Sequence, residues 1–510
     1  MAEKSQVADF YSGKNLFITG GTGFLGICLI EKLLRSVPDL GTVYLLMRPK
    51  KGKQIEERLH EISKNVIFEK YLETNTPDVF NKLVAVAGEI GEENLGLSPE
   101  DRAMLKKNVD VVFHSAATLD FQQNLRPTVQ INLLGTRRVM ELCKEMDKLK
   151  VMIHVSSAFV SSFRLSCEEI LYPPPEDAEK IIGLSTTLTD DALEALEPSL
   201  LKDHPNTYTF TKHLAEHEVA KCADLFPCTI VRPSMITAAW KEPVPGWTIS
   251  KNGPQGFLMG ASKGVVRRLP VAKGLISDYI PVDVVVNELL VAGYRAATDK
   301  GPLSIYHCTS STVRPFMWAS VETKVNEYLH KYPLRSAVWY PHLKFVGSIW
   351  LFKLSAIFVH FIPAYILDFV TKLSGGRPIL VRLHTNVNNS LARLDRFIFT
   401  EWKFHNPKTM ELNKTLNDTD KTKYQIDIST LQWEEYFSDL TLGVRRYLSN
   451  EPITTLKAGI KRDGVLRILH TLLQAAIYLS VWTFVAMYFD TPFRKCAWVL
   501  PVAYVLFGYF

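Results

Sequence analysis

The sequence contains few cysteines, and their spacing predicts neither a disulfide framework nor a zinc site. Seven cysteines are spread over 510 residues, their number is odd, and no Cys-x-x-Cys pair occurs. Disulfide scaffolds and zinc sites both need paired or closely spaced thiols, so we expect no metal site. Reduced thiols are typical of a protein that faces the cytosol.

A strong charge of one sign is also absent. Fifty-nine Lys and Arg residues stand against 53 Asp and Glu residues, which leaves a formal charge of +6. A small excess without a localised basic stripe argues against nucleic-acid binding. Hydrophobic residues at 47% and charged residues at 22% are near the averages of globular proteins, which argues against a disordered chain or a multi-span transporter. The first fifteen residues are polar, so no secretory signal peptide is expected.

Short apolar runs alternate with segments of helical periodicity over the first half of the chain. This alternation predicts an α/β fold with a doubly wound, Rossmann-type parallel sheet. The segment 176–201 is polar and helix-forming, and we expect it to leave the sheet as an excursion. The runs expected to be buried strands are residues 16–19, 43–47, 83–87, 109–113, 151–155 and 229–231.

The last fifty residues differ from the rest of the sequence. Residues 468–489 contain no Asp, Glu, Lys or Arg, and a helix of this length can cross a hydrocarbon core about 30 Å thick. Basic residues at positions 457, 461, 462 and 467 precede the run, so the positive-inside rule places the N-terminal body in the cytosol. A second apolar segment, 496–510, is short for a full span. A buried core helix is the alternative interpretation of residues 468–489.

A glycine-rich segment follows the first predicted strand and opens the first predicted helix. Such a turn lets backbone amides approach a pyrophosphate and lets the helix pack closely on the strand, which is the dinucleotide-binding fingerprint. The candidate cofactor-binding residues in this segment are Thr19, Gly20, Gly23, Phe24, Leu25 and Gly26. Ala116 and Ala117 after the fourth strand, and Pro233 and Ser234 after the sixth, are further candidates.

The end of the second predicted strand indicates which nicotinamide cofactor is bound. Enzymes that prefer NAD usually present an acidic residue there, but this strand runs into Arg48-Pro49-Lys50-Lys51. The guanidinium of Arg48 can bind a 2′-phosphate with two parallel hydrogen bonds. The sequence therefore predicts NADPH, and a solvated basic loop is the alternative.

Tyr208 and Lys212 lie four residues apart, one helical turn, so both side chains can face the same side of a helix. A nearby ammonium lowers the pKa of a phenol and prepares it to exchange a proton with a carbonyl oxygen. Ser156 and Ser157 follow the strand at 151–155 and would add a hydroxyl that polarises the same oxygen. The candidate catalytic residues are Tyr208, Lys212 and Ser157.

Together these motifs resemble the extended short-chain dehydrogenase/reductase superfamily and, within it, the animal fatty acyl-CoA reductases. The resemblance covers nearly the whole chain. The stretches that carry the closer match are Glu242-Pro243-Val244-Pro245-Gly246-Trp247, Asn252-Gly253-Pro254, Gly264-Val265-Val266-Arg267, residues 280–287, Trp402-Lys403-Phe404, Asp427, Trp433, Tyr436 and residues 443–448.

The resemblance implies NADPH-dependent reduction of a long-chain or very-long-chain acyl-CoA, through an aldehyde, to a fatty alcohol. Tyr208 would donate the proton, Lys212 would lower its pKa and bind the nicotinamide ribose, and Ser157 would hold the carbonyl oxygen. Family members often have Thr where this chain has Ser157, and Asp where it has Glu89. The segment 248–251 also departs from the family pattern, which bears on substrate preference.

The resemblance also suggests how the chain is divided and where it acts. We expect an NADPH-binding reductase domain with substrate-covering insertions at 1–314, a helical domain at 315–450 and a membrane anchor at 465–510. An acyl-CoA substrate, a peroxisomal or endoplasmic reticulum membrane, and a role in wax or ether lipid synthesis are expected, and a homodimer is left open. The alternatives are another extended reductase or epimerase acting on a sterol or sugar nucleotide, and a catalytically silent scaffold.

Overall fold

The computed structural model describes residues 3–50, 52–121, 123–299, 301, 303–502 and 504. The chain forms two compact units, each assembled from separate stretches of sequence. Unit 1 comprises Met1–Trp247, Ile276–Phe316 and Trp402–Leu431, and unit 2 comprises Thr248–Leu275, Met317–Glu401 and Gln432–Phe510. The division into functional domains at residues 314 and 450 stays a prediction.

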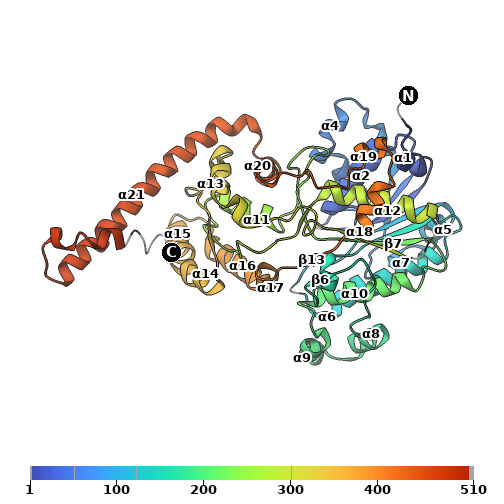
Figure 1. Ribbon diagram of the computed structural model, residues 1–510, viewed down its shortest axis with the longest axis horizontal. Coiled ribbons are helices and arrows are strands. Elements are labelled where there is room, and N and C mark those ends of the chain that lie inside the picture. Colours follow the sequence, from blue (N-terminus) through green and yellow to red (C-terminus); the bar gives the residue numbers. More distant parts are fainter. Residues whose placement is uncertain are drawn as a thin grey trace. The chain divides into compact units, whose positions relative to one another are not determined.

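A seven-stranded parallel sheet forms the centre of unit 1 (Figure 1). The order is β11-β7-β5-β4-β1-β2-β3, so the chain winds outward from β1 in both directions, which confirms the doubly wound fold. All six strands expected from sequence are present, and β11 was not foreseen. The strands are β1 (Leu16–Thr19), β2 (Val43–Met47), β3 (Leu83–Ala87), β4 (Val111–His114), β5 (Val151–Val155), β7 (Cys228–Pro233) and β11 (Ser304–Cys308).

Helices cover both faces of this sheet because its central strands are apolar on both sides. Helix α2 (Phe24–Ser36) packs with α12 (Val282–Asp299), which also contacts β5 and β7, and α7 (Leu134–Lys144) packs with α10 (Thr207–Ala220) (Figure 1). The direction in which successive strands are added to the sheet changes at β1, because β2 lies on one side of it and β4 on the other. Ligands of open α/β sheets bind at such a point, at the carboxyl ends of the strands.

The smaller elements of unit 1 surround the sheet. Its other helices are α1 (Gln6–Tyr11), α3 (Ile55–Ser63), α4 (Glu69–Leu72), α5 (Pro99–Asn108), α6 (Leu125–Thr128), α8 (Ala178–Thr187), α9 (Asp190–Leu201), α18 (Pro407–Lys414) and α19 (Asp418–Lys423). Two short parallel pairs join β6 (Ser166–Cys167) to β13 (Lys403–Phe404) and β8 (Met235–Thr237) to β10 (Tyr279–Pro281).

Unit 2 is mainly helical, with one two-stranded parallel pair of β9 (Arg268–Pro270) and β12 (Lys344–Val346). Its helices are α11 (Pro254–Ser262), α13 (Glu322–Lys331), α14 (Ile349–Ala356), α15 (Ile362–Leu373), α16 (Leu380–Arg393), α17 (Asp395–Ile398), α20 (Trp433–Gly443) and α21 (Leu456–Tyr488).

Two helical stretches are long and apolar enough to cross a membrane, judged by length and composition. They are Ile349–Leu373, with a mean hydropathy of 1.7, and Ile453–Tyr488, with a mean hydropathy of 1.5. The second contains nearly all of the uncharged run predicted from sequence, and none of its most apolar window is buried against the rest of the chain. Of the second apolar segment, 496–510, residues 503 and 505–510 lie outside the described residues.

Candidate active site

The glycine-rich loop connects β1 to α2, and two of its positions have no room for a side chain. Gly20 has φ +77°, and a Cβ there would lie 2.7 Å from Ser115 Oγ and 2.8 Å from Ala116 N. A Cβ on Gly26 would lie 2.3 Å from the carbonyl oxygen of Gly20. Gly23 caps α2 without a side-chain hydrogen bond, so the first amides of the helix point into a cradle made of backbone alone. Such a cradle fits the pyrophosphate of a dinucleotide.

Hydrogen bonds from the end of β4 hold this loop in place. Ser115 Oγ donates to the carbonyl oxygen of Thr19 at 2.8 Å, and the amide of Ala116 donates to Thr19 Oγ1 at 3.2 Å. The ring of His114 lies 2.7 Å from the same hydroxyl and is buried. Burial, and after it the charge of Lys212, lower the pKa of His114 to about 3, so this histidine is neutral and structural. The structure thus brings the predicted Thr19 and Ala116 together.

Arg48 lies just beyond β2 and forms an ion pair with Glu89 at the end of β3. A second arginine, Arg58 of α3, donates to the backbone carbonyl of Arg48 and, at 3.2 Å, to Thr22 Oγ1 in the glycine-rich loop. The sequence analysis missed Arg58 because it lies in a charged helix, eleven residues beyond the end of the strand that indicates the cofactor. The guanidinium of Arg58 therefore contacts the loop, and the guanidinium of Arg48 pairs with Glu89.

Helix α10 carries both Tyr208 and Lys212, and its N-cap is Asn206, whose side chain accepts from the amide of Thr209 at 2.9 Å. Tyr208 is buried and hydrogen-bonded to Ser157, which follows β5. Ser157 Oγ also accepts from the amide of Phe159 at 3.3 Å. The predicted phenol and the predicted hydroxyl are thus brought together at the carboxyl end of a central strand.

The pKa of Tyr208 differs from the sequence expectation. Burial raises it to about 12, and the hydrogen bond with Ser157 opposes that rise only in part. We expected Lys212 to lower it, but the ammonium of Lys212 donates to the carbonyl oxygen of Val155 at 2.6 Å instead. Burial also lowers the pKa of Lys212 to about 8. The site therefore holds a neutral phenol, able to donate a proton, one helical turn from a buried ammonium.

Asn132 is a residue of this site that the sequence analysis missed. It lies in a short π-helical turn, Val129–Leu133, and its side chain is buried. Its Oδ1 accepts from the amide of Thr118 at 3.0 Å, and its Nδ2 donates to Thr211 Oγ1 at 3.2 Å. It thereby joins the loop after β4 to the helix that carries Tyr208. A π-turn inside a helix occurs often at functional sites, but the sequence showed only helical periodicity here.

At the end of β7, Pro233 is the last residue of the strand and Ser234 follows it. The amide of Ser234 donates to the carbonyl oxygen of Cys308 at 3.1 Å. Its hydroxyl is buried and has no hydrogen-bond partner among the described residues. A buried polar group without a partner is costly, which fits a position that completes its hydrogen bonding with a bound cofactor.

A buried ion pair fixes the other end of α10. Glu216, one turn beyond Lys212, accepts from Arg232 of β7 at 2.7 and 2.8 Å, and neither side chain is exposed. Arg232 also donates to the carbonyl oxygen of Ile170 at 2.9 Å. The paired guanidinium keeps the pKa of Glu216 below its ordinary value against the effect of burial. This pair holds the helix of Tyr208 and Lys212 against the sheet.

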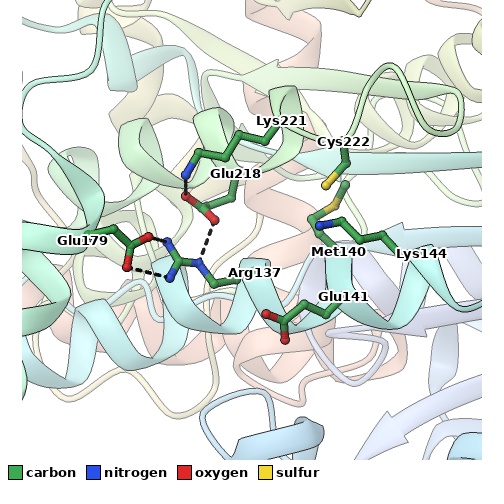
Figure 2. A pocket seen from close by; sticks show the side chains of 8 residues that line it. All are labelled: Arg137, Met140, Glu141, Lys144, Glu179, Glu218, Lys221 and Cys222. Carbon is green, nitrogen blue, oxygen red and sulfur yellow. Dashed lines mark hydrogen bonds and ion pairs between the residues drawn. The ribbon is translucent and has the colours of Figure 1, made fainter.

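A surface pocket over α7 and α10 is separate from these residues (Figure 2). Arg137 reaches Glu179 on one side and Glu218 on the other, and Lys221 also donates to Glu218, so these charges neutralise one another. Glu218 lies about 15 Å along the helix axis from Tyr208. We therefore assign the pocket no part in the chemistry of Tyr208. It is lined by Arg137, Met140, Glu141, Lys144, Glu179, Glu218, Lys221 and Cys222.

Comparisons with known proteins agree with this site. A family model described as "Male sterility protein" matches residues 18–289, and another with the same description matches residues 359–451. A Drosophila melanogaster protein, "Putative fatty acyl-CoA reductase CG8306", is 58% identical over 99% of both chains. Fatty acyl-CoA reductase 1 of Rattus norvegicus is 34% identical over 93% of this chain and 92% of its own, and the Homo sapiens protein is 34% identical over the same shares.

Two solved structures with a similar fold are reductase domains. The reductase domain of a nonribosomal peptide synthetase from Mycobacterium tuberculosis has a TM-score of 0.56 and 18% identity, covering 87% of this chain and 95% of its own. The terminal R domain of a myxalamid biosynthetic pathway has a TM-score of 0.52 and 19% identity, covering 83% and 92%. The resemblance drawn from the motifs is confirmed by the sequence relatives: the chain belongs to the fatty acyl-CoA reductase family, within the extended short-chain dehydrogenases/reductases.

Proposed function

We propose that this protein reduces long-chain or very-long-chain acyl-CoA to the corresponding primary alcohol, with release of CoA and an aldehyde as intermediate. The relatives named as fatty acyl-CoA reductases support the substrate class. The observation that carries the proposal is the meeting of Tyr208, Ser157 and Lys212 beside the glycine-rich loop. Their roles are inferred from this geometry and from the chemistry of the residues.

Tyr208 acts as the proton donor in each reduction step. Because its pKa is raised to about 12, the phenol keeps its proton at neutral pH and can give it to a carbonyl oxygen that gains negative charge. Ser157, bonded to the same phenol, holds that oxygen in position. The bound nicotinamide cofactor supplies the hydride.

Lys212 and Asn132 support the donor. The ammonium of Lys212 lies where it can bind a ribose hydroxyl and stabilise a phenolate once the proton has left. Its present bond to Val155 fixes the direction of the side chain. The buried side-chain amide of Asn132 bonds both to Thr211, which lies on the same helix as Tyr208, and to the loop after β4. It therefore fixes the distance between Tyr208 and that loop.

The cofactor is NADPH in this proposal. The guanidinium of Arg58 contacts the glycine-rich loop, and the acidic group at this edge, Glu89, is ion-paired with Arg48. A 2′-phosphate would compete with that carboxylate for the guanidinium and would form bidentate hydrogen bonds with it. NADH lacks this group, so it gains nothing from either arginine.

The C-terminal helix anchors the protein to an organelle membrane in this proposal, peroxisomal or of the endoplasmic reticulum, with the body in the cytosol. Support comes from the uncharged run inside α21 and from the basic residues that precede it. Fatty alcohols are used to make waxes and ether lipids, so the product suits a role in either. A homodimer is an open part of the proposal.

The test uses the purified full-length protein in detergent, with NADPH and palmitoyl-CoA. We expect NADPH oxidation that depends on the acyl-CoA, free CoA, and hexadecanol identified by mass spectrometry. Oxidation that stays at the background rate, with no alcohol, would favour the silent scaffold. Turnover of a sterol or a sugar nucleotide in place of the thioester would favour the other extended reductases.

A further inference from the structure

Unit 2 contains a pair of adjacent arginines at the start of its strand pair. Arg268 begins β9 and lies opposite Lys344 of β12 in the parallel register. The amide of Lys344 donates to the carbonyl oxygen of Arg267 at 3.0 Å. Two cationic residues that are consecutive in sequence and a third on the neighbouring strand therefore gather at one end of a two-stranded sheet, where their like charges repel each other.

Neither guanidinium has an anionic partner in the described part of the chain. Arg268 is only 6% exposed, and the Nε atoms of Arg267 and Arg268 are both buried without a hydrogen-bond partner among the described residues. The one hydrogen bond of the Arg268 guanidinium that the structure gives is to the backbone carbonyl of Arg267, at 3.0 Å. The nearby carboxylate of Glu322 is ion-paired with Lys273. A buried charge without a counter-ion is costly, so an external anion would stabilise this arrangement.

A neighbouring histidine holds the backbone of the two arginines, and the histidines beside them are neutral at pH 7. His360 Nε2 accepts from the amides of Arg267 and Arg268 at 3.1 and 3.2 Å, so the backbone of the pair is fixed by a buried ring. The pKa of His342 falls to about 4, first through loss of solvation and then through the charges of the two arginines, so this ring is neutral at pH 7. Burial lowers the pKa of each arginine only to about 10, so both stay charged at neutral pH.

The same cluster is connected to the start of the apolar helix α21. The ring of Tyr340 stacks on His330 at 4.8 Å and on His470 of α21 at 5.4 Å, and Nδ1 of His330 donates a hydrogen bond to the carboxylate of Asp463 of α21 at 3.1 Å. The carboxylate of Asp463 is therefore paired with His330 and not with either arginine. The charge of Arg267 also acts on His470, so the arginines lie in the part of unit 2 that contacts the N-terminal half of α21.

We propose that Arg267 and Arg268, together with Lys344, form a binding site for a phosphate group. A planar guanidinium matches a phosphate with two parallel hydrogen bonds, and two of them beside a lysine can hold a dianion. Two sources carry this chemistry: the nucleotide phosphates of CoA and the headgroup of a phospholipid. The CoA source rests on the proposed function, whereas the lipid source does not.

A kinetic experiment distinguishes CoA from a phospholipid as the source of the bound phosphate. It compares the full-length wild type with R267Q and R268Q, and with K324Q as a control, because Lys324 of α13 is an exposed cation of the same unit. If CoA is the ligand, we expect KM for palmitoyl-CoA to rise roughly tenfold or more in R267Q and R268Q with kcat unchanged. KM for S-palmitoyl pantetheine, which lacks the nucleotide phosphates, is expected to stay the same.

A second measurement needs no variant that might lose its fold. Phenylglyoxal labels arginines, and mass spectrometry of the wild type reports the rate at Arg267 and Arg268. Slower labelling with palmitoyl-CoA but not with S-palmitoyl pantetheine supports the CoA source. Slower labelling with phosphatidic acid but not with phosphatidylcholine supports the lipid source, and in that case KM for palmitoyl-CoA is expected to stay unchanged in R267Q.

The proposal is overturned if neither phosphate-bearing probe slows labelling and R267Q and R268Q behave as K324Q does. Failure of the proposed function is a different result: the wild type would make no alcohol from either thioester, while protection by phosphatidic acid would still support the phosphate site.

Discussion

The ammonium of Lys212 lies 2.6 Å from the backbone carbonyl oxygen of Val155, the last residue of β5. This bond ties the helix of Tyr208 to the strand that leads into Ser157, so the three candidate catalytic residues share one rigid support. The arrangement depends on a charged side chain that is buried, and it therefore predicts a dependence on pH.

We expect kcat to fall as the pH rises above about 8. Burial lowers the pKa of Lys212 from 10.5 to about 8, so the ammonium is present at pH 7 and is lost through that range. Because an unfolded lysine keeps its proton up to about 10.5, this group makes the folded protein more stable as the pH rises from about 8 to 10.5, and that gain is lost as the pH falls from 10.5 to about 8. Rates measured between pH 6 and 10 test this, and a K212R variant should move the fall to higher pH. An unchanged profile in K212R would contradict the assignment.

Arg48 and Arg58 give a prediction about cofactor choice. We expect Arg48→Ala and Arg58→Ala each to weaken NADPH binding roughly tenfold or more, because each removes hydrogen bonds to a charged group. NADH binding should change little. Dissociation constants of both cofactors, measured by fluorescence titration, are the test, with K82Q on the neighbouring edge of the sheet as a control. Equal losses for NADPH and NADH would count against a 2′-phosphate site.

The buried pair of Glu216 and Arg232 gives a prediction about stability. Glu216→Gln leaves the guanidinium of Arg232 buried without its counter-charge, and we expect the free energy of unfolding to fall by about 3–5 kcal/mol. Glu327→Gln, which breaks the exposed pair with Lys324, should cost less than about 1 kcal/mol. Denaturant unfolding of the detergent-solubilised protein compares them. Similar small losses in both variants would show that the buried pair does not hold α10.

The apolar helix gives a prediction about membrane attachment. Ile477→Asp places a charge in the middle of the uncharged run, at a cost of about 2.5–3.5 kcal/mol in a bilayer. We expect the protein to move from the carbonate-washed membrane pellet to the supernatant. Ile460→Asp, also exposed on α21 but upstream of the run, is the matched control and should stay in the pellet. Identical fractionation of the two variants would mean that residues 468–489 do not anchor the chain.

Much of the fold followed from the sequence because local patterns dictate it. The strands at 16–19 and 151–155 are continuous apolar runs, and the glycines at 20 and 26 are required by backbone packing that any sequence with this loop shares. The strand β11 was missed because its five residues, Ser304 to Cys308, mix polar and apolar side chains and are recognisable only through their pairing with β7.

Only part of the site could be predicted from the sequence, namely the part that local patterns reveal. Tyr208 and Lys212 are related by helical spacing, which sequence displays, whereas Asn132 and Arg58 reach the site through the packing of distant elements. The pKa of Tyr208 could not be inferred either. It depends on how deeply the phenol is buried and on where the ammonium of Lys212 is directed, and both are tertiary properties.

The central claim is that Tyr208 delivers the proton during reduction of an acyl-CoA, and one measurement tests it most directly. Single-turnover reduction of palmitoyl-CoA is followed in wild type, Y208F and the control Y294F, whose hydroxyl contacts Gln6 of α1 instead. We predict that Y208F binds NADPH and acyl-CoA as the wild type does but forms hexadecanol at a small fraction of its rate, while Y294F is unaffected. Hexadecanol formed by Y208F at the wild-type rate would contradict the account.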